Sequence, residues 1–392
     1  MFKNFAARIP TYWPSALLAI SCLLCSGSSS ATEQRELRIY NWSDYIDAEL
    51  LVRFEAETGI KVVYDTYDSN LEVEQIILKG GQGYDLVVPS IDFMGKQLKK
   101  GYFQRLDTAR LKNYPKLDPK LMKQVSELDI QNAHGIPYMW GTTGIGYNIN
   151  KVREVLGADA PTDSWSLVFN PANVAKLSAC GVSVIDAPYE VFAAAVNYLG
   201  RNPNSPRTQD YQDASEKLLK KIAPYISINA SDYNERLAQG DLCVVIGYSG
   251  DIYQAMAEAA EGVELAYAIP REGAQMWVDM LAIPELARNV DEAHEFIDFL
   301  LRPDVAAANT NYIWYPNPVL DSIPLIDKEI TSDKSIYPTP QVLSKLYTGN
   351  LRKAKVRRVI EDGWNEVMEI SQPLSKETGN AAVADQGAQP SS

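Results

Sequence analysis

Histidine and cysteine are scarce in this sequence, and their scarcity excludes several kinds of chemistry. Two histidines, His134 and His294, and four cysteines occur in 392 residues. A structural zinc site needs four such ligands at regular spacing, which these residues do not offer. Neither histidine stands in a motif typical of nucleophilic catalysis, so both are expected to be structural or surface residues. No metal, cofactor or catalytic residue is therefore expected.

Positive charge is also in deficit. Lys and Arg number 37 against 50 Asp and Glu, which gives a formal net charge of −13. A chain of this balance is not expected to bind nucleic acid or an anionic membrane surface. An acidic surface usually serves solubility, but it also attracts cations.

A long apolar run appears only near the N-terminus. Lys3 and Arg8 precede an apolar stretch over residues 15–25, and small residues lead up to Ala31. This pattern predicts a secretory signal peptide over residues 1–31, cleaved near Ala31. Its stretch is too short to span a membrane. Cys22 weakly resembles a lipoprotein acylation site.

The predicted export of the chain bears on its charge and its cysteines. Removing residues 1–31 takes away two basic residues and no acid, so the mature net charge becomes −15. Cys180 and Cys243 are then the remaining cysteines. In an exported chain oxidation is the default, so these two are predicted to form one disulfide.

The order of predicted elements indicates an α/β fold. The length suits two domains. Strands and helices alternate with short connections, which predicts a mostly parallel sheet covered on both faces. The glycine-rich segment 135–148 is interpreted as a crossing between lobes, with glycine supplying hinge freedom. Residues 372–392 are expected to be disordered. The predicted strands are 37–40, 60–66, 84–90, 182–185, 242–246 and 277–283, and the predicted helices are 47–58, 70–78, 189–199, 215–222, 252–260, 291–301 and 356–370.

Polar and aromatic residues gather where the predicted strands end, which is where open α/β sheets bind ligands. An aromatic residue lies one to three positions from an acid at five of six such places, without Lys or Arg in any cluster. Aromatic faces attract ammonium groups and carboxylates accept their hydrogen bonds, so a small organic cation such as an aliphatic amine is the expected ligand. The clusters are Trp42, Ser43, Asp44 and Tyr45; Ser90, Asp92 and Phe93; Asp186, Tyr189 and Glu190; Tyr248, Ser249 and Asp251; Trp277 and Asp279; Trp314 and Tyr315.

Several longer motifs carry a resemblance to a known family. They are NWSDYI at 41–46, DLVVPS at 85–90, PYMW at 137–140, TTGIGYN at 142–148, CGV at 180–182 and LRPDV at 301–305. Together they resemble the periplasmic polyamine-binding proteins of bacterial ABC transporters, and the putrescine-binding member most of all. The resemblance runs from Leu37 to Met368.

The resemblance implies a two-lobed, type II periplasmic-binding fold with a central hinge and a ligand cleft. The lobes would comprise residues 36–139 with about 257–314, and residues 140–256 with about 315–370. Such a protein captures putrescine or spermidine in the periplasm and delivers it to inner-membrane ABC permease subunits. A monomer is expected.

The resemblance also implies roles for individual residues. Asp251 and Asp279 would hold one terminal ammonium, and Cys180 and Cys243 match the family's disulfide. Tyr138 and Trp140 are interpreted as hinge packing. The aromatic walls would be Trp42, Tyr45, Trp277, Tyr315 and Tyr248, the last standing where relatives carry Trp. Ser43, Asp44, Ser90 and Glu190 would serve the other end and the middle of the ligand.

The choice of polyamine stays open at this point. Trp277 fits the spermidine binders, and Asp44 and Asp92 add carboxylates that a triamine could use. Phe93 and Ala187 match the putrescine pattern instead. The charge count and Trp277 favour spermidine slightly.

Ligand binding is expected to be coupled to closure of the cleft. Mutual repulsion should raise the pKa values of the cleft carboxylates and resist closure, until a cationic ligand neutralises them. Two rival functions fit parts of the pattern. A secreted glycoside hydrolase also places paired carboxylates among aromatics. A binding protein for a sugar or an amino acid is the other rival, although an amino-acid site wants an Arg that the clusters lack.

Overall fold

A nine-stranded sheet organises the chain. The computed structural model describes residues 34–229, 232–350 and 352–371, so the predicted signal peptide, Cys22 and the predicted disordered tail lie outside the described residues. The strand order is β2-β1-β3-β9-β4-β7-β5-β6, with β8 paired to β4. The strands are β1 (Glu36–Trp42), β2 (Lys61–Tyr67), β3 (Leu86–Val87), β4 (Gly135–Asn148), β5 (Val182–Ile185), β6 (Ser227–Asn229), β7 (Val244–Tyr248), β8 (Leu265–Ala268) and β9 (Met276–Ala282).

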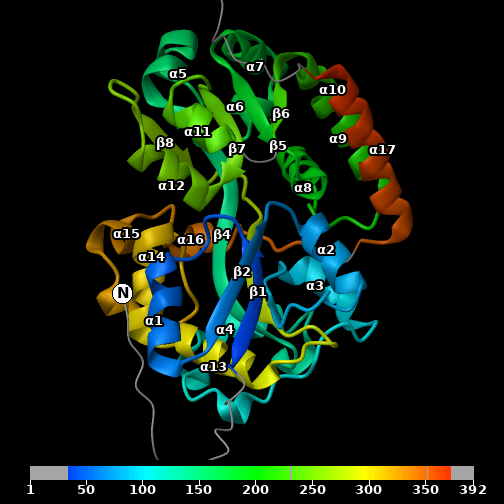
Figure 1. The fold of residues 1–392 in the computed structure, drawn as a ribbon. Helices are drawn as coiled ribbons and strands as arrows, with labels where there is room; N and C mark the ends of the chain where they lie inside the picture. Colours follow the sequence, from blue (N-terminus) through cyan, green and yellow to red (C-terminus); the bar gives the residue numbers. More distant parts are fainter. Residues whose placement is uncertain (1–33, 230–231, 351, 372–392) are drawn as a thin grey trace, which may run out of the picture. The chain divides into compact units, whose positions relative to one another are not determined.

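The long strand β4 belongs to two groups of strands (Figure 1). Its residues 135–142 pair with β9, beside β3, β1 and β2, which we call the first half-sheet. Its residues 143–148 pair with β7 and β8, and β7 leads on to β5 and β6, which we call the second half-sheet. β8 therefore lies in the second half-sheet, although the predicted lobe ranges assign it to the first lobe. The lobe division itself stays a prediction.

Glycines in β4 allow aromatic rings to pack closely against the strand, and the hinge freedom expected of them stays a prediction. The segment is one extended strand, and none of its glycines has a positive φ. A Cβ on Gly141 would lie 2.5 Å from the Trp277 ring, and one on Gly144 would collide with the Tyr267 hydroxyl. Aromatic rings therefore lie directly against the backbone of this strand.

The centre of the sheet differs from the mostly parallel prediction. The outer pairs β1–β2, β1–β3, β5–β6 and β5–β7 are parallel, as expected for βαβ units. The pairs of β9 with β3 and of β4 with β7, β8 and β9 are antiparallel. β4 and β9 carry the chain between the half-sheets in opposite directions, which makes the middle of the sheet antiparallel.

Helices pack around both half-sheets. Each of the seven predicted helical ranges overlaps a helix, whereas α3–α7, α9, α11 and α14–α16 lie where no helix was predicted. The predicted helix 215–222 is a π-helical turn (Ser215–Leu219) followed by α10, and Pro303 occupies the first turn of a further helix, α14. The α-helices are α1 (Ala48–Thr58), α2 (Asn70–Leu78), α3 (Ile91–Leu98), α4 (Pro119–Val125), α5 (Ile149–Leu156), α6 (Ser166–Phe169), α7 (Pro171–Leu177), α8 (Pro188–Tyr198), α9 (Thr208–Ala214), α10 (Lys220–Ile222), α11 (Tyr233–Ala238), α12 (Ser249–Ala257), α13 (Val290–Leu300), α14 (Pro303–Ile313), α15 (Lys328–Ser332), α16 (Pro340–Leu343) and α17 (Ala354–Ile370).

Separate hydrophobic cores support the two half-sheets. One large cluster includes Trp165, Phe192 and Ile246 and lies with the second half-sheet. Phe54 and Phe296 belong to a cluster of the first half-sheet, with their rings 4.9 Å apart. In the described part of the chain, no helix has the length and apolar character that membrane crossing requires.

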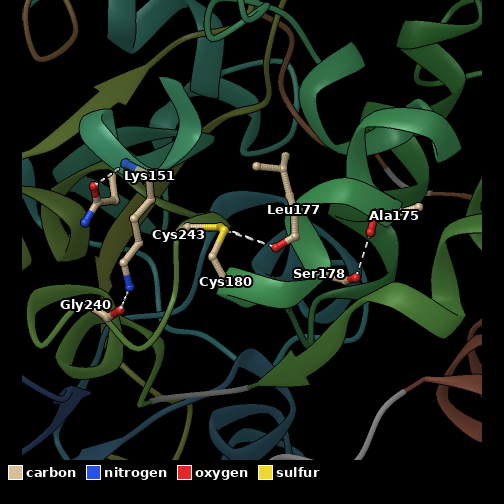
Figure 2. The surroundings of a disulfide bond; sticks show 8 residues. Lys151, Ala175, Leu177, Ser178, Cys180, Gly240 and Cys243 are labelled. Carbon is tan, nitrogen blue, oxygen red and sulfur yellow. Dashed lines mark hydrogen bonds between the residues drawn. A yellow bond between two sulfur atoms is a disulfide. The ribbon is translucent and has the colours of Figure 1, made fainter. Parts of the chain in front are cut away.

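The disulfide prediction is confirmed. Cys180 and Cys243 are bonded across a sequence separation of 63 residues. Figure 2 shows the bond beside Leu177, whose carbonyl oxygen lies 3.1 Å from the Cys180 sulfur. Cys180 immediately precedes the turn into β5 and Cys243 immediately precedes β7. The bond therefore ties the starts of two neighbouring parallel strands together.

Candidate functional site

One pocket of about 120 Å³ gathers all eleven of the predicted ligand residues. They come from both half-sheets, from positions separated by more than 270 residues in the sequence. The lining residues are Trp42, Ser43, Asp44, Tyr45, Ser90, Glu190, Tyr248, Asp251, Trp277, Asp279 and Tyr315, together with Tyr67, Asp68, Asn70, Asn234 and Gln254, which sequence reasoning missed.

The corner after β1 is built by strand pairing and one unusual turn. Trp42 closes the strand opposite Tyr67 of β2, and its indole N–H donates to the Val88 carbonyl at 2.9 Å. Asp44 has a φ of 51°, a left-handed conformation that an aspartate tolerates better than most residues. This turn places Tyr45, which is buried, against the pocket.

Asp279 is the most deeply buried acid of the pocket. The Ser90 hydroxyl donates to its Oδ1 at 2.6 Å, and the Tyr45 hydroxyl donates to its Oδ2 at 2.9 Å. Burial raises the pKa of Asp279 to about 7, although these two hydrogen bonds oppose the rise. Ser90 and Asp279 therefore lie together, whereas the resemblance assigned them to different parts of the ligand.

Asp251 lies in the first turn of α12, directly after β7. The Tyr315 hydroxyl donates to its Oδ1 at 2.8 Å, and the Tyr233 hydroxyl donates to its Oδ2. Burial raises the pKa of this carboxyl, and the charge of Asp44 adds to the rise. Tyr233 does not line the pocket, and no signal in the sequence singles it out.

Glu190 is the third acid, in the first turn of α8. It accepts hydrogen bonds from the hydroxyls of Thr143, at 2.5 Å, and Tyr248, at 3.3 Å. Burial raises its pKa to about 7, ahead of repulsion from Asp92 and Asp279. The prediction that mutual repulsion raises these pKa values is therefore incomplete, because loss of solvent is the larger cause.

Aromatic rings form a continuous wall between these acids. The Trp277 ring centroid lies 5.1 Å from that of Tyr315 and 5.9 Å from that of Tyr248, in edge-to-face contacts. Tyr45 meets Tyr315 in the same way at 5.4 Å. A Cβ on Gly250 would collide with the Tyr315 ring, so only glycine leaves room for the wall there. The buried Trp277 indole N–H has no hydrogen-bond partner among the described residues.

Several other predicted candidates lie elsewhere. Asp92, Phe93 and Tyr189 line a small neighbouring cavity instead of the pocket. Asp186 accepts a hydrogen bond from the Trp364 indole at 2.7 Å. Trp314 stacks on Tyr253 at 5.6 Å. Asp92 is therefore not positioned to serve a ligand in the main pocket, contrary to the expectation for a triamine.

The residues expected to be structural have structural contacts. The His134 ring nitrogen Nδ1 lies 2.9 Å from Asp129 Oδ1, and His294 Nε2 accepts from the backbone N–H of Asp107 at 3.0 Å. The Tyr138 hydroxyl donates to the Tyr45 carbonyl at 2.7 Å. Within the described ranges, no three His, Cys, Asp or Glu side chains converge as a metal ion would require.

Some of the residues that were not predicted lie at the end of a strand, where open α/β sheets bind ligands, and could have been predicted on that ground. Tyr67 is the last residue of β2, and Asp68 and Asn70 follow it; β2 runs parallel to β1 and ends at the same edge. Asn70 donates to the Ser90 hydroxyl at 3.0 Å and so supports the donor to Asp279. Asn234 and Gln254 lie on helices, where nothing in the local sequence distinguishes them.

Comparisons with known proteins agree with one another. A family model described as bacterial extracellular solute-binding protein matches residues 49–338. The putrescine-binding periplasmic protein PotF of Escherichia coli is 46% identical over 91% of this chain and 97% of its own. The putrescine-binding periplasmic protein SpuD of Pseudomonas aeruginosa is 45% identical over 87% and 94%. Among solved structures, the spermidine/putrescine ABC transporter substrate-binding protein PotD of Streptococcus pneumoniae superposes with a TM-score of 0.73 at 30% identity, covering 86% of this chain and 99% of that one.

Proposed function

Because the chain belongs to the bacterial extracellular solute-binding proteins, we propose that it captures an aliphatic polyamine and delivers it to an ABC permease. Putrescine and spermidine are the ligands that the names of its relatives carry. The relatives are named as binding proteins, which supports a role in binding without catalysis. The periplasm is the proposed compartment and a monomer the proposed state.

One observation carries the proposal: the pocket is acidic and has no cation of its own. Asp279 is buried, Asp251 and Glu190 are half-buried, and no Lys or Arg is among the described residues that line the pocket. Carboxylates withdrawn from water are costly unless a positive charge accompanies them. A dicationic ligand supplies that charge, and the aromatic wall suits its methylene groups.

The contacts support the proposal that different residues of the pocket bind different parts of the ligand. Asp251 and Asp279 are each bonded by a tyrosine, and those tyrosines touch each other, so the two acids share one aromatic pair. We assign one terminal ammonium to these acids. Glu190, Asp44 and Ser43 are assigned to the rest of the ligand. Trp277 is assigned to the methylene groups of the ligand through its ring, which lines the pocket.

Closure follows from where these acids lie. Asp279 belongs to β9 of the first half-sheet, whereas Asp251 and Glu190 follow strands of the second. A ligand that contacts all three joins the two predicted lobes. Binding and closure are therefore coupled, and the permease is proposed to recognise the closed form.

A thermal-shift panel on the mature protein tests the function. Putrescine, cadaverine, spermidine and spermine are each added, with a sugar and an amino acid as controls. We expect at least one polyamine to raise the melting temperature strongly and the controls to leave it unchanged. Hydrolysis of a glycoside without any polyamine shift would favour the rival enzyme.

A further inference from the structure

A second aromatic and acidic site lies beside the pocket, and a lysine occupies it. The small cavity is lined by Asp92, Phe93, Lys96, Tyr189, Asn350, Arg352 and Arg357. The Lys96 ammonium lies 4.6 Å from the centroid of the Phe93 ring and 5.5 Å from that of Tyr189. We call Asp92, Phe93, Lys96 and Tyr189 the lysine cage.

The cage has the chemistry of the pocket. Two aromatic rings meet edge to face at 6.4 Å, and the Asp92 charge acts on Lys96 from the same helix. Burial lowers the pKa of the Lys96 ammonium, while Asp92 and Glu74 oppose that fall. Burial raises the pKa of Asp92, and the positive charges of Arg352 and Lys96 oppose that rise. The Lys96 side chain is an alkylammonium held among aromatic rings and near a carboxylate. The proposed ligand carries the same alkylammonium group.

The cage adjoins the pocket at two points along the chain. Asp92 stands two residues after Ser90 at the start of α3, and Tyr189 directly precedes Glu190 in α8. Ser90 and Glu190 line the pocket. The charge of Asp92 also acts on both Glu190 and Asp279. Figure 1 shows α3 with the first half-sheet and α8 with the second, so both sites lie where the half-sheets meet.

We infer that Lys96 determines specificity by occupying, with its own ammonium, the subsite that the third ammonium of a longer polyamine would take. The inference rests on the proposed function and deepens it: the chain selects a short diamine over a triamine. Arg352, whose guanidinium lies 5.6 Å from the Tyr189 centroid, adds a second positive charge at the same boundary. Like-charge repulsion is a common means of rejecting a competing ligand.

The Lys96→Ala variant tests the inference by vacating the cage. Calorimetry compares the binding of putrescine, the diamine, with that of spermidine, the triamine, on the wild-type protein and on the variant. Wild type should prefer the diamine. In the variant, spermidine affinity should rise about tenfold, because the two rings and the Asp92 carboxylate can then receive an ammonium without the competing charge of Lys96. Diamine affinity should change less than about twofold.

Matched variants show where any gain comes from. Lys100→Ala removes the same charge from an exposed position near the same helix and should leave the preference unchanged. Lys96→Ala combined with Asp92→Asn should lose the spermidine gain, because the vacated cage then lacks its carboxylate. An unchanged spermidine-to-diamine ratio in folded Lys96→Ala overturns the inference.

Asp92→Asn alone tests the inference without vacating the cage. Because Lys96 already fills the subsite, spermidine affinity should fall no more than diamine affinity does. A selective loss of spermidine greater than about fivefold would mean that a ligand reaches Asp92 in the wild-type protein, which overturns the inference. If wild type binds neither amine, the proposed function fails; if it prefers spermidine, only the inference fails.

Discussion

The pocket and the lysine cage are two neighbouring sites of similar composition that differ in charge, because the pocket is acidic and the cage balances one acid with one base. Both place aromatic rings beside a carboxylate at the junction of the half-sheets. The cage includes a lysine of the protein, whereas no Lys or Arg is among the described residues that line the pocket. Because the Lys96 ammonium belongs to the protein itself, it occupies the cage without the loss of translational and rotational entropy that a free ligand would incur. Both sites have aromatic rings, so the rings do not distinguish them. The absence of a basic side chain among the described lining residues is what distinguishes the proposed ligand site from the cage.

Removing a pocket acid should break the comparison most severely. We expect Asp279→Ala and Asp251→Ala each to weaken polyamine binding at least about hundredfold, because a buried ammonium would lose its partner. Calorimetry on folded protein measures the loss, with Lys100→Ala as a surface control. Unchanged affinity in either variant would refute that residue's assignment.

Acidification should act oppositely on binding and on the stability of the free protein. Burial raises the pKa of Asp279 and of Glu190 to about 7 in the folded state, against ordinary values of 3.8 and 4.5. Both carboxyls take up protons as the pH falls through 7, so polyamine affinity should drop at least about tenfold between about pH 8 and about pH 5.5.

The same protons favour the folded state, because the unfolded chain binds them more weakly. The contribution of these two groups to the free energy of unfolding should therefore rise as the pH falls from about 8 toward about 5, and level off below the unfolded pKa values. Calorimetric titrations and melting temperatures at each pH check both trends. Affinity that rises on acidification would contradict the role of these carboxylates.

Two glycines allow a finer test of the contrast between the sites. A Cβ on Gly250 would collide with the Tyr315 ring of the pocket, and one on Gly349 would lie 2.5 Å from the Asp92 carboxylate of the cage. Gly250→Ala should weaken diamine binding about fivefold by displacing the aromatic wall. Gly349→Ala should affect the melting temperature but change diamine affinity less than about twofold. Equal losses of affinity would show that the two sites are not distinct.

The site residues were predictable because each strand end can be recognised locally. Trp42, Asp251 and Asp279 stand in or just after short apolar strands, and the half-sheets bring those ends together. Tyr233 could not be found in this way, because its hydroxyl reaches Asp251 and the backbone N–H of Tyr248 from another helix, α11. The pairing of Ser90 with Asp279 likewise depends on contacts across 189 residues.

The parallel strands β1, β2, β3, β5 and β7 were predicted, whereas the short strands β6 and β8 and the antiparallel centre of the sheet were not. βαβ patterns fix the parallel pairs, because strand, helix and strand follow one another in the sequence. The antiparallel position of β9 between β3 and β4 depends on long-range pairing, which local patterns do not encode. Gly141 accommodates the ring of Trp277 from a distant strand, a contact that the local sequence does not indicate.

The late arrival of β9 has a consequence for how the chain acquires its structure. β9 lies between β3 and β4 in the sheet, yet it begins at Met276, 141 residues after β4 starts at Gly135. During synthesis from the N-terminus, β1, β2 and β3 are therefore made well before β9. Until β9 is made, the edge of β3 that pairs with β9 has no hydrogen-bonding partner. Contacts this distant in sequence slow folding and expose unpaired strands to other chains. Asp279 lies on that same strand, so the first half-sheet and the set of acids that line the pocket are completed together, and Tyr315 joins the aromatic wall afterwards.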